Sequence, residues 1–215
     1  VAWAARQRWR GAQVWQGQQA GDPLSACAQV LELAPRGRLR FLDRATVLLG
    51  FPHVHYLMLP WQAGLNSPAD WQGFAEALFR QQAGLDPEQW QVQIANNSFG
   101  HERLAVAVAR ELMQDLRELF RLHRLPLVTC TPLLMAVAQR YWRQLPDDCV
   151  LAVPELQGLS CLYRQQGAPH QVCVLPTQPG SDLSDNLFTA DLLTQQHAAT
   201  TLIVANRPTE HWLGP

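Results

Sequence analysis

Two histidines separated by one residue, His53 and His55, have side chains that can bind a metal ion. On a β-strand, residues i and i+2 point to the same face, which is the geometry that a two-histidine metal site needs. A third ligand is missing from this stretch, because Leu57 and Leu59 on the same face are apolar. We therefore expect the polar start of a buried strand and no bound metal. A metal-dependent hydrolase that uses His53 and His55 is kept as the alternative function.

The five cysteines give a second candidate site, because Cys161 and Cys173 fall opposite each other if residues 165–169 close a hairpin. Such a pair is either a redox couple or two small apolar side chains on one face of a sheet. The cysteines are scattered, with no C-x-x-C pair, which is typical of thiols in a reducing cytoplasm and favours the second interpretation. A nucleophile formed by Cys173 and His170 is excluded, because residues three apart on a strand face opposite sides.

The composition excludes several classes of protein. Apolar residues make up 47% of the 215 residues and charged residues only 16%, as in a globular chain. All 17 basic residues are arginine, which excludes mechanisms that need a lysine, such as P-loop and Schiff-base chemistry. The formal net charge of −1 provides no general field for nucleic acid, and we expect no nucleic-acid partner. We expect no membrane span in this chain, although its start at Val1 leaves open an anchor beyond either end.

Helical and strand patterns alternate along most of the chain, and they indicate the elements on which the candidate histidines and cysteines lie. Helical spacing of apolar side chains, with caps such as Asp22, Ser67 and Gly84, predicts helices that begin near Pro23, Ser67, Arg110, Pro132 and Leu183. Alternating or β-branched stretches predict strands over 12–19, 45–50, 53–59, 90–96, 104–109, 126–131, 149–154, 159–164, 171–175 and 201–205.

The order of these elements predicts an α/β protein with mixed sheets and flanking helices. Residues 148–205 read as three strands, a helix and a strand, and residues 45–131 follow a related order. Three antiparallel strands followed by helix–strand units build a mixed sheet with helices packed on its faces. We therefore predict two related subdomains, the first over 1–146 and the second, which is reduced, over 147–215.

Three stretches carry a recognisable pattern: "VHYLMLPW", "RLAVAVARELMQDLRELFRLHRLPLVTCTPLLMAVAQ" and "VLAVPELQGLSCLYRQQGAPHQVCVLP". They resemble the actin-like (ribonuclease H-like) ATPases, in particular the cytoplasmic actin-like proteins of bacterial type II secretion and type IV pilus assembly. The stretch "VHYLMLPW" is similar to a strand of that family that ends in Leu-Pro before a helix. "RLAVAVARELMQDLRELFRLHRLPLVTCTPLLMAVAQ" resembles its strand, helix, strand and helix. "VLAVPELQGLSCLYRQQGAPHQVCVLP" resembles the opening hairpin and third strand of its second domain. The resemblance, over roughly residues 45–205, implies an actin-like fold of two subdomains.

The phosphate-binding positions of that family are altered in this sequence. Nucleotide-binding members carry Asp-x-Gly followed by Ser or Thr at the turn of the second-domain hairpin, where backbone amides and the hydroxyl bind phosphate. The matching stretch here is PELQGLS, in which Glu155, Gly158 and Ser160 stand at a different spacing. No Gly-Gly turn follows Val174 to hold adenosine. The resemblance therefore implies a degenerate phosphate loop at Glu155, Gly158 and Ser160, with no catalytic residue and no cofactor.

The resemblance implies a non-catalytic scaffold or adaptor that binds other assembly proteins, among them an inner-membrane component, at the cytoplasmic face of the inner membrane. The eight tryptophans agree with protein–protein contacts, where this residue is enriched. A nuclease related to ribonuclease H ranks last, because the predicted strands carry almost no carboxylates. The oligomeric state and the identity of the partners stay open.

Overall fold

The computed structural model describes residues 2–6, 14–19, 21–34, 43–97, 100–178, 180–196 and 200–204. The chain divides into two compact units. The described residues among 1–47 and 111–130 form unit 1, and those among 48–110 and 131–206 form unit 2. Each unit combines segments that are distant in the sequence. The predicted division at residue 146 follows chain order and stays a prediction.

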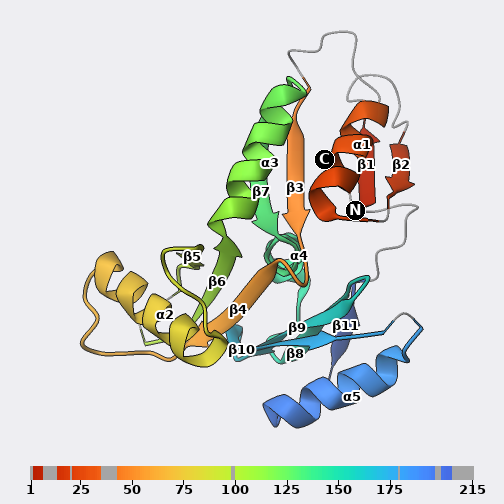
Figure 1. Cartoon of the computed structure of the whole chain (residues 1–215). Helices are drawn as coiled ribbons and strands as arrows, with labels where there is room; N and C mark the ends of the chain where they lie inside the picture. The colour runs from red at the N-terminus through yellow and green to blue at the C-terminus, as the bar shows by residue number, and fades with distance from the viewer. Residues whose placement is uncertain are drawn as a thin grey trace. The chain divides into compact units, whose positions relative to one another are not determined.

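Strands and helices alternate along the described chain (Figure 1). The strands are β1 (Ala2–Arg6), β2 (Val14–Gln18), β3 (Ala45–Leu49), β4 (Val54–Leu59), β5 (Trp90–Ile94), β6 (Arg103–Ala109), β7 (Leu127–Pro132), β8 (Cys149–Pro154), β9 (Gly158–Gln165), β10 (Ala168–Pro176) and β11 (Thr201–Ile203). The helices are α1 (Pro23–Leu33), α2 (Pro68–Ala83), α3 (Arg110–Leu122), α4 (Leu133–Tyr141) and α5 (Leu183–Thr194), with a short 3₁₀ helix, η2 (Trp142–Gln144), after α4.

Local sequence signals explain where the helices begin and end. At α1 the Asp22 carboxylate accepts a hydrogen bond from the Ser25 N–H at 3.0 Å. At α2 the Ser67 hydroxyl and the Asp70 carboxylate form a reciprocal capping box. α2 ends at Gly84, whose φ of 66° is left-handed and free of strain only for glycine. These ends are where the sequence predicts them.

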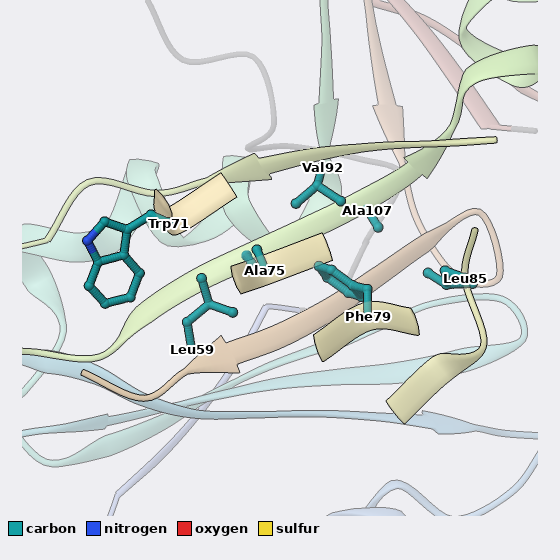
Figure 2. Packing of buried hydrophobic residues seen from close by; sticks show 8 residues of the cluster. Leu59, Trp71, Ala75, Phe79, Leu85, Val92 and Ala107 are labelled. Atoms are coloured by element: carbon teal, nitrogen blue, oxygen red, sulfur yellow. The ribbon is translucent and has the colours of Figure 1, made fainter. Parts of the chain in front are cut away.

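The first half of unit 2 is an antiparallel sheet in the order β4-β6-β5, covered on one face by α2. Trp71, Ala75 and Phe79, spaced by four residues along α2, are buried against this sheet. They meet the inward side chains of the strands and of the loop after the helix (Figure 2), which are Leu59, Leu85, Val92, Ala105 and Ala107. The run Arg103–Ala109 is thus a strand, as its β-branched residues predict.

The second half of unit 2 is a mixed sheet in the order β10-β9-β8-β11. β9 is antiparallel to both β8 and β10, and β11 is parallel to β8. α5 packs on one face of this sheet, where Ala190 lies against Val150 and Cys161. α4 contacts β8 and β9 and buries Leu134 and Val137. The predicted order of three antiparallel strands, a helix and a further strand is therefore confirmed.

The structure differs from the predicted elements at one strand end and by one additional strand. The strand predicted to begin at His53 begins at Val54, because His53 lies in the turn after β3 and donates its backbone N–H to the Gly50 carbonyl at 2.9 Å. β1 was not predicted, since AWAAR contains no β-branched residue. The α/β class with mixed sheets and flanking helices is confirmed.

Candidate functional site

The three residues of the predicted phosphate loop lie at the turn between β8 and β9, in unit 2. β8 ends at Pro154, and Glu155 follows it as the first residue of the turn. The backbone N–H of Glu155 donates to the carbonyl of Gly158 at 2.7 Å, which closes the turn at the start of β9. Ser160 lies two residues further along β9 and is fully buried. The structure therefore brings Glu155, Gly158 and Ser160 together.

The Glu155 carboxylate binds two donors of the protein itself. Its Oε1 accepts a hydrogen bond from the Ser160 hydroxyl at 2.6 Å. Its Oε2 accepts a hydrogen bond from the backbone N–H of Phe51 at 2.6 Å. Phe51 lies in the turn between β3 and β4, so the Glu155 side chain joins two turns that are distant in the sequence. Hydrogen bonds to a carboxylate of this length are among the stronger ones in proteins.

Two glycines make this close approach possible. A Cβ atom at Gly50 would lie 1.9 Å from Glu155 Oε2, closer than any side chain allows. A Cβ atom at Gly158 would lie 3.0 Å from the Phe51 ring. The absence of a side chain at Gly50 therefore leaves room for the Glu155 carboxylate, and its absence at Gly158 leaves room for the Phe51 ring. In this turn glycine serves packing within the protein.

Burial controls the charge of this group. Burial raises the pKa of Glu155 above its ordinary value, and the hydrogen bonds from Ser160 and Phe51 oppose the shift only in part. The Tyr56 hydroxyl lies nearby on β4, and its pKa is raised by burial and by the neighbouring Glu155 carboxylate. A carboxyl group that is half-buried and held by two donors is a structural anchor in this arrangement.

The arrangement limits what chemistry the turn can perform. Both oxygens of Glu155 and the hydroxyl of Ser160 are engaged with each other and with Phe51. Each carboxylate oxygen already accepts one hydrogen bond from the protein, and the Ser160 hydroxyl has no second proton to donate to a phosphate oxygen. Sequence reasoning identified the members of the β8–β9 turn but missed Gly50, Phe51 and Tyr56, since their contact with Glu155 bridges about a hundred residues.

His53 and His55 are not arranged as a pair of metal ligands on one strand face, because His53 precedes β4. The His55 ring packs edge-on against Trp90, with 4.9 Å between ring centroids, and burial lowers its pKa. Among the residues that the structure describes, no group of three or more His, Cys, Asp or Glu side chains is placed to hold a metal ion. The metal-dependent hydrolase gains no support from this geometry.

The predicted pairing of Cys161 with Cys173 across the β9–β10 hairpin is confirmed by the strand register. Both thiols are free. Burial raises the pKa of Cys161 to about 12, and it also raises the pKa of Cys173. A thiol that stays protonated is a poor nucleophile. The two side chains pack against the face of the sheet that α5 covers.

Three of the tryptophans lie against arginine side chains inside unit 2. The Arg103 guanidinium lies 4.3 Å from the centre of the Trp71 ring and 5.9 Å from that of Trp61. The Arg164 guanidinium lies 4.5 Å from the centre of the Trp142 ring. These pairs therefore stabilise the unit itself. The side chains of Trp3, Trp9 and Trp212 lie outside the described residues.

None of the helices in the described ranges has the length and apolar character needed to cross a bilayer.

No known family model and no curated protein matches the sequence. Solved structures do match. The chain is similar to the cytoplasmic domain of EpsL, an inner-membrane component of the type II secretion system of Vibrio cholerae. The TM-score is 0.64 and the identity 14%, over 99% of this chain and 82% of that chain.

Two further structures share this architecture. One is a protein of Bacteroides thetaiotaomicron with an actin-like ATPase fold, at a TM-score of 0.58 and 10% identity, over 91% of this chain and 72% of that chain. The other is from the PilM–PilN type IV pilus biogenesis complex, at 0.53 and 17%, over 84% of this chain and 60% of that chain. The predicted fold class is confirmed: the chain has the actin-like ATPase fold, which it shares with components of secretion and pilus assemblies.

Proposed function

We propose that this protein is a non-catalytic scaffold or adaptor that binds partner proteins in a secretion or pilus-type assembly. The support from the comparisons is the fold, which is shared with an inner-membrane secretion component and with a pilus biogenesis complex. The place of action that fits such a role is the cytoplasmic face of the inner membrane. Its partners would be other assembly proteins, among them an inner-membrane component.

One observation carries the non-catalytic part of this proposal. The Glu155 carboxylate, an anion of the protein itself, accepts the Phe51 N–H and the Ser160 hydroxyl. A phosphate group binds to donors of these two kinds. Because the Gly50 backbone already lies against the carboxylate, a phosphate would have to displace the side chain. Glu155, Gly158 and Ser160 are thus the members of a degenerate phosphate loop that the protein has filled with its own side chain.

Isothermal titration of the purified chain with ATP and Mg²⁺ tests this proposal. We expect no heat of binding and no phosphate release, for the wild type and for Ser160→Ala alike. Saturable, magnesium-dependent binding in the micromolar range would overturn the claim that the protein works without nucleotide.

Partner binding is tested separately. Purified inner-membrane and cytoplasmic components of the same organism's secretion or pilus system are mixed with this chain and separated by size exclusion. A scaffold is expected to co-elute with at least one of them at micromolar concentration. If the chain co-elutes with none of the components, the scaffold role is contradicted. The result on nucleotide binding is unaffected.

A further inference from the structure

Three arginines surround a shallow hollow at the end of α3 in unit 1. Arg117, Arg121 and Arg124 line it, and its volume is about 450 Å³. Its apolar lining comes from Phe120, Leu125, Pro126 and Leu127. Arg121 is paired with Glu118 at 2.6 Å, with both side chains exposed. Within the described chain, Arg117 and Arg124 are exposed and take part in no ion pair. The hollow thus combines positive charge with apolar surface.

The way α3 ends builds this hollow. Arg117 and Arg121 are one turn apart on the same face of the helix. After the helix the chain turns back, with the Leu125 N–H donating to the Phe120 carbonyl at 3.0 Å. Arg124 adopts a left-handed φ of 51° at this turn, a position that usually holds glycine. The turn places the third arginine beside the other two and brings Leu125 next to Phe120.

The outer side of α5, in unit 2, has the complementary character. Ala190, Leu183 and Leu187 face the sheet, while Phe188, Leu192 and Leu193 are exposed by 65%, 66% and 64%. Phe188 and Leu192 are one turn apart and form an apolar stripe. The segment from Asp182 to Gln196 carries the acidic residues Asp182, Asp185 and Asp191 and no basic residue.

We propose that the arginine-lined hollow of one copy of this chain binds the outer face of α5 of a second copy. Phe188 and Leu192 would enter the apolar part of the hollow, and Asp185, three residues before Phe188, would approach the free guanidiniums. The two surfaces differ from each other, so the contact repeats head to tail and does not close into a two-fold dimer. A single helix in a shallow hollow buries little area, so the association is weak, with a Kd on the order of 10–100 μM.

The charges around the hollow favour a protein helix over a membrane. α3 also carries Glu111, Asp115 and Glu118 on the neighbouring stripe of the same helix. An anionic lipid surface lying across α3 would meet both stripes, whereas a docked helix touches only the arginine side. The proposal goes beyond the scaffold role proposed above and does not depend on whether nucleotide binds.

Sedimentation velocity at rising micromolar concentration tests the proposal. The wild type should show an average mass that grows past that of a dimer. Arg117→Glu combined with Arg124→Glu should weaken association by at least about tenfold. Leu192→Arg should do the same from the other side of the contact. A mixture of these two variants retains one intact hollow and one intact α5 face, so it should form a heterodimer and grow no further.

The matched control is Arg80→Glu combined with Arg143→Glu, which changes the net charge by the same amount at exposed positions elsewhere. It should associate like the wild type. Heterodimer formation by the mixed variants also shows that both are folded. A wild type that stays monomeric at every concentration would overturn the proposal, as would a control that loses association equally. Growth of the mixture past a heterodimer, or binding of anionic vesicles in place of self-association, would overturn it too.

Discussion

Replacing Glu155 by alanine removes the contact that joins the β8–β9 turn to the β3–β4 turn. The variant loses the acceptor for the Phe51 N–H and for the Ser160 hydroxyl, both at 2.6 Å. Ser160 is fully buried, so water does not readily replace the carboxylate. The burial of a charge acts in the opposite direction, since burial raises the pKa of Glu155 and disfavours its ionised form.

The size of the effect follows from the unsatisfied donors. Each buried donor left without an acceptor costs about 1–3 kcal/mol, so the two donors together cost about 2–6 kcal/mol. Removing the buried carboxylate offsets part of this cost, so Glu155→Ala should lower the free energy of unfolding by about 2–3 kcal/mol. Glu155→Gln is the matched control, because its amide oxygen can accept from Phe51 and its amide nitrogen can donate to the Ser160 oxygen. We expect this variant to change the free energy of unfolding by less than about 1 kcal/mol.

The same carboxylate gives the wild type a pH dependence of defined sign. A raised pKa means that the folded protein binds more protons at this site than the unfolded chain does. The contribution to stability is complete below the ordinary pKa of 4.5 and is lost as the pH rises through the folded value. The stability of the wild type relative to Glu155→Gln should therefore fall as the pH rises above 4.5.

Urea titrations followed by tryptophan fluorescence measure these free energies, and amide hydrogen exchange of Phe51 reports on the local contact. Exchange at Phe51 should speed up in Glu155→Ala and stay close to the wild-type rate in Glu155→Gln. An alanine variant that matches the wild type within about 0.5 kcal/mol, with unchanged exchange at Phe51, would refute the contact.

Three further predictions concern packing and thiol chemistry. Gly50→Ala should lower the free energy of unfolding about as much as Glu155→Ala, because the new Cβ would lie 1.9 Å from the Glu155 carboxylate. Gly73→Ala is the control: its Cβ has open space in α2, and it should raise the free energy of unfolding by about 0.5–1 kcal/mol. Equal effects of the two alanines in urea titrations would contradict this geometry. Phe79→Ala should lower the free energy of unfolding by about 3–5 kcal/mol, since the ring lies in the core of the β4-β6-β5 sheet, and a loss below about 1 kcal/mol would place it outside that core. The Cys161 thiol, with its pKa raised by burial to about 12, should resist alkylation in the native protein and react after unfolding; rapid native labelling, read by mass spectrometry, would show an accessible thiolate.

Local signals in the sequence were sufficient for most of the elements. α2 begins at the capping box of Ser67 and Asp70 and ends at the left-handed Gly84. Both signals depend only on residues that are neighbours along the chain. The alternation in Trp90–Ile94 matches a strand with one buried side. The pairing of Cys161 with Cys173 followed from the hairpin loop alone. Such features need no knowledge of distant contacts.

The contacts within the candidate site could be identified only from the three-dimensional structure. The sequence placed Glu155, Gly158 and Ser160 in one turn, but the partner of Glu155 is a backbone N–H at Phe51, and a backbone group leaves no mark in a sequence. In the sequence, Gly50 indicates only the end of a strand; its contact with the Glu155 carboxylate is visible only in the structure. The sequence alone suggests His55 as a metal ligand. It gives no sign of the contact between His55 and Trp90 on β5, because these residues are far apart in the chain.

The central claim is that the Glu155 side chain fills the place where a nucleotide phosphate would bind. A two-dimensional NMR spectrum of the ¹⁵N-labelled wild type, recorded with and without millimolar Mg²⁺-ATP, tests it at the residues concerned. We expect no change in the backbone amide signals of Phe51, Gly158 and Ser160. Saturable shifts of these signals, with loss of the Phe51 hydrogen bond to Glu155, would contradict it.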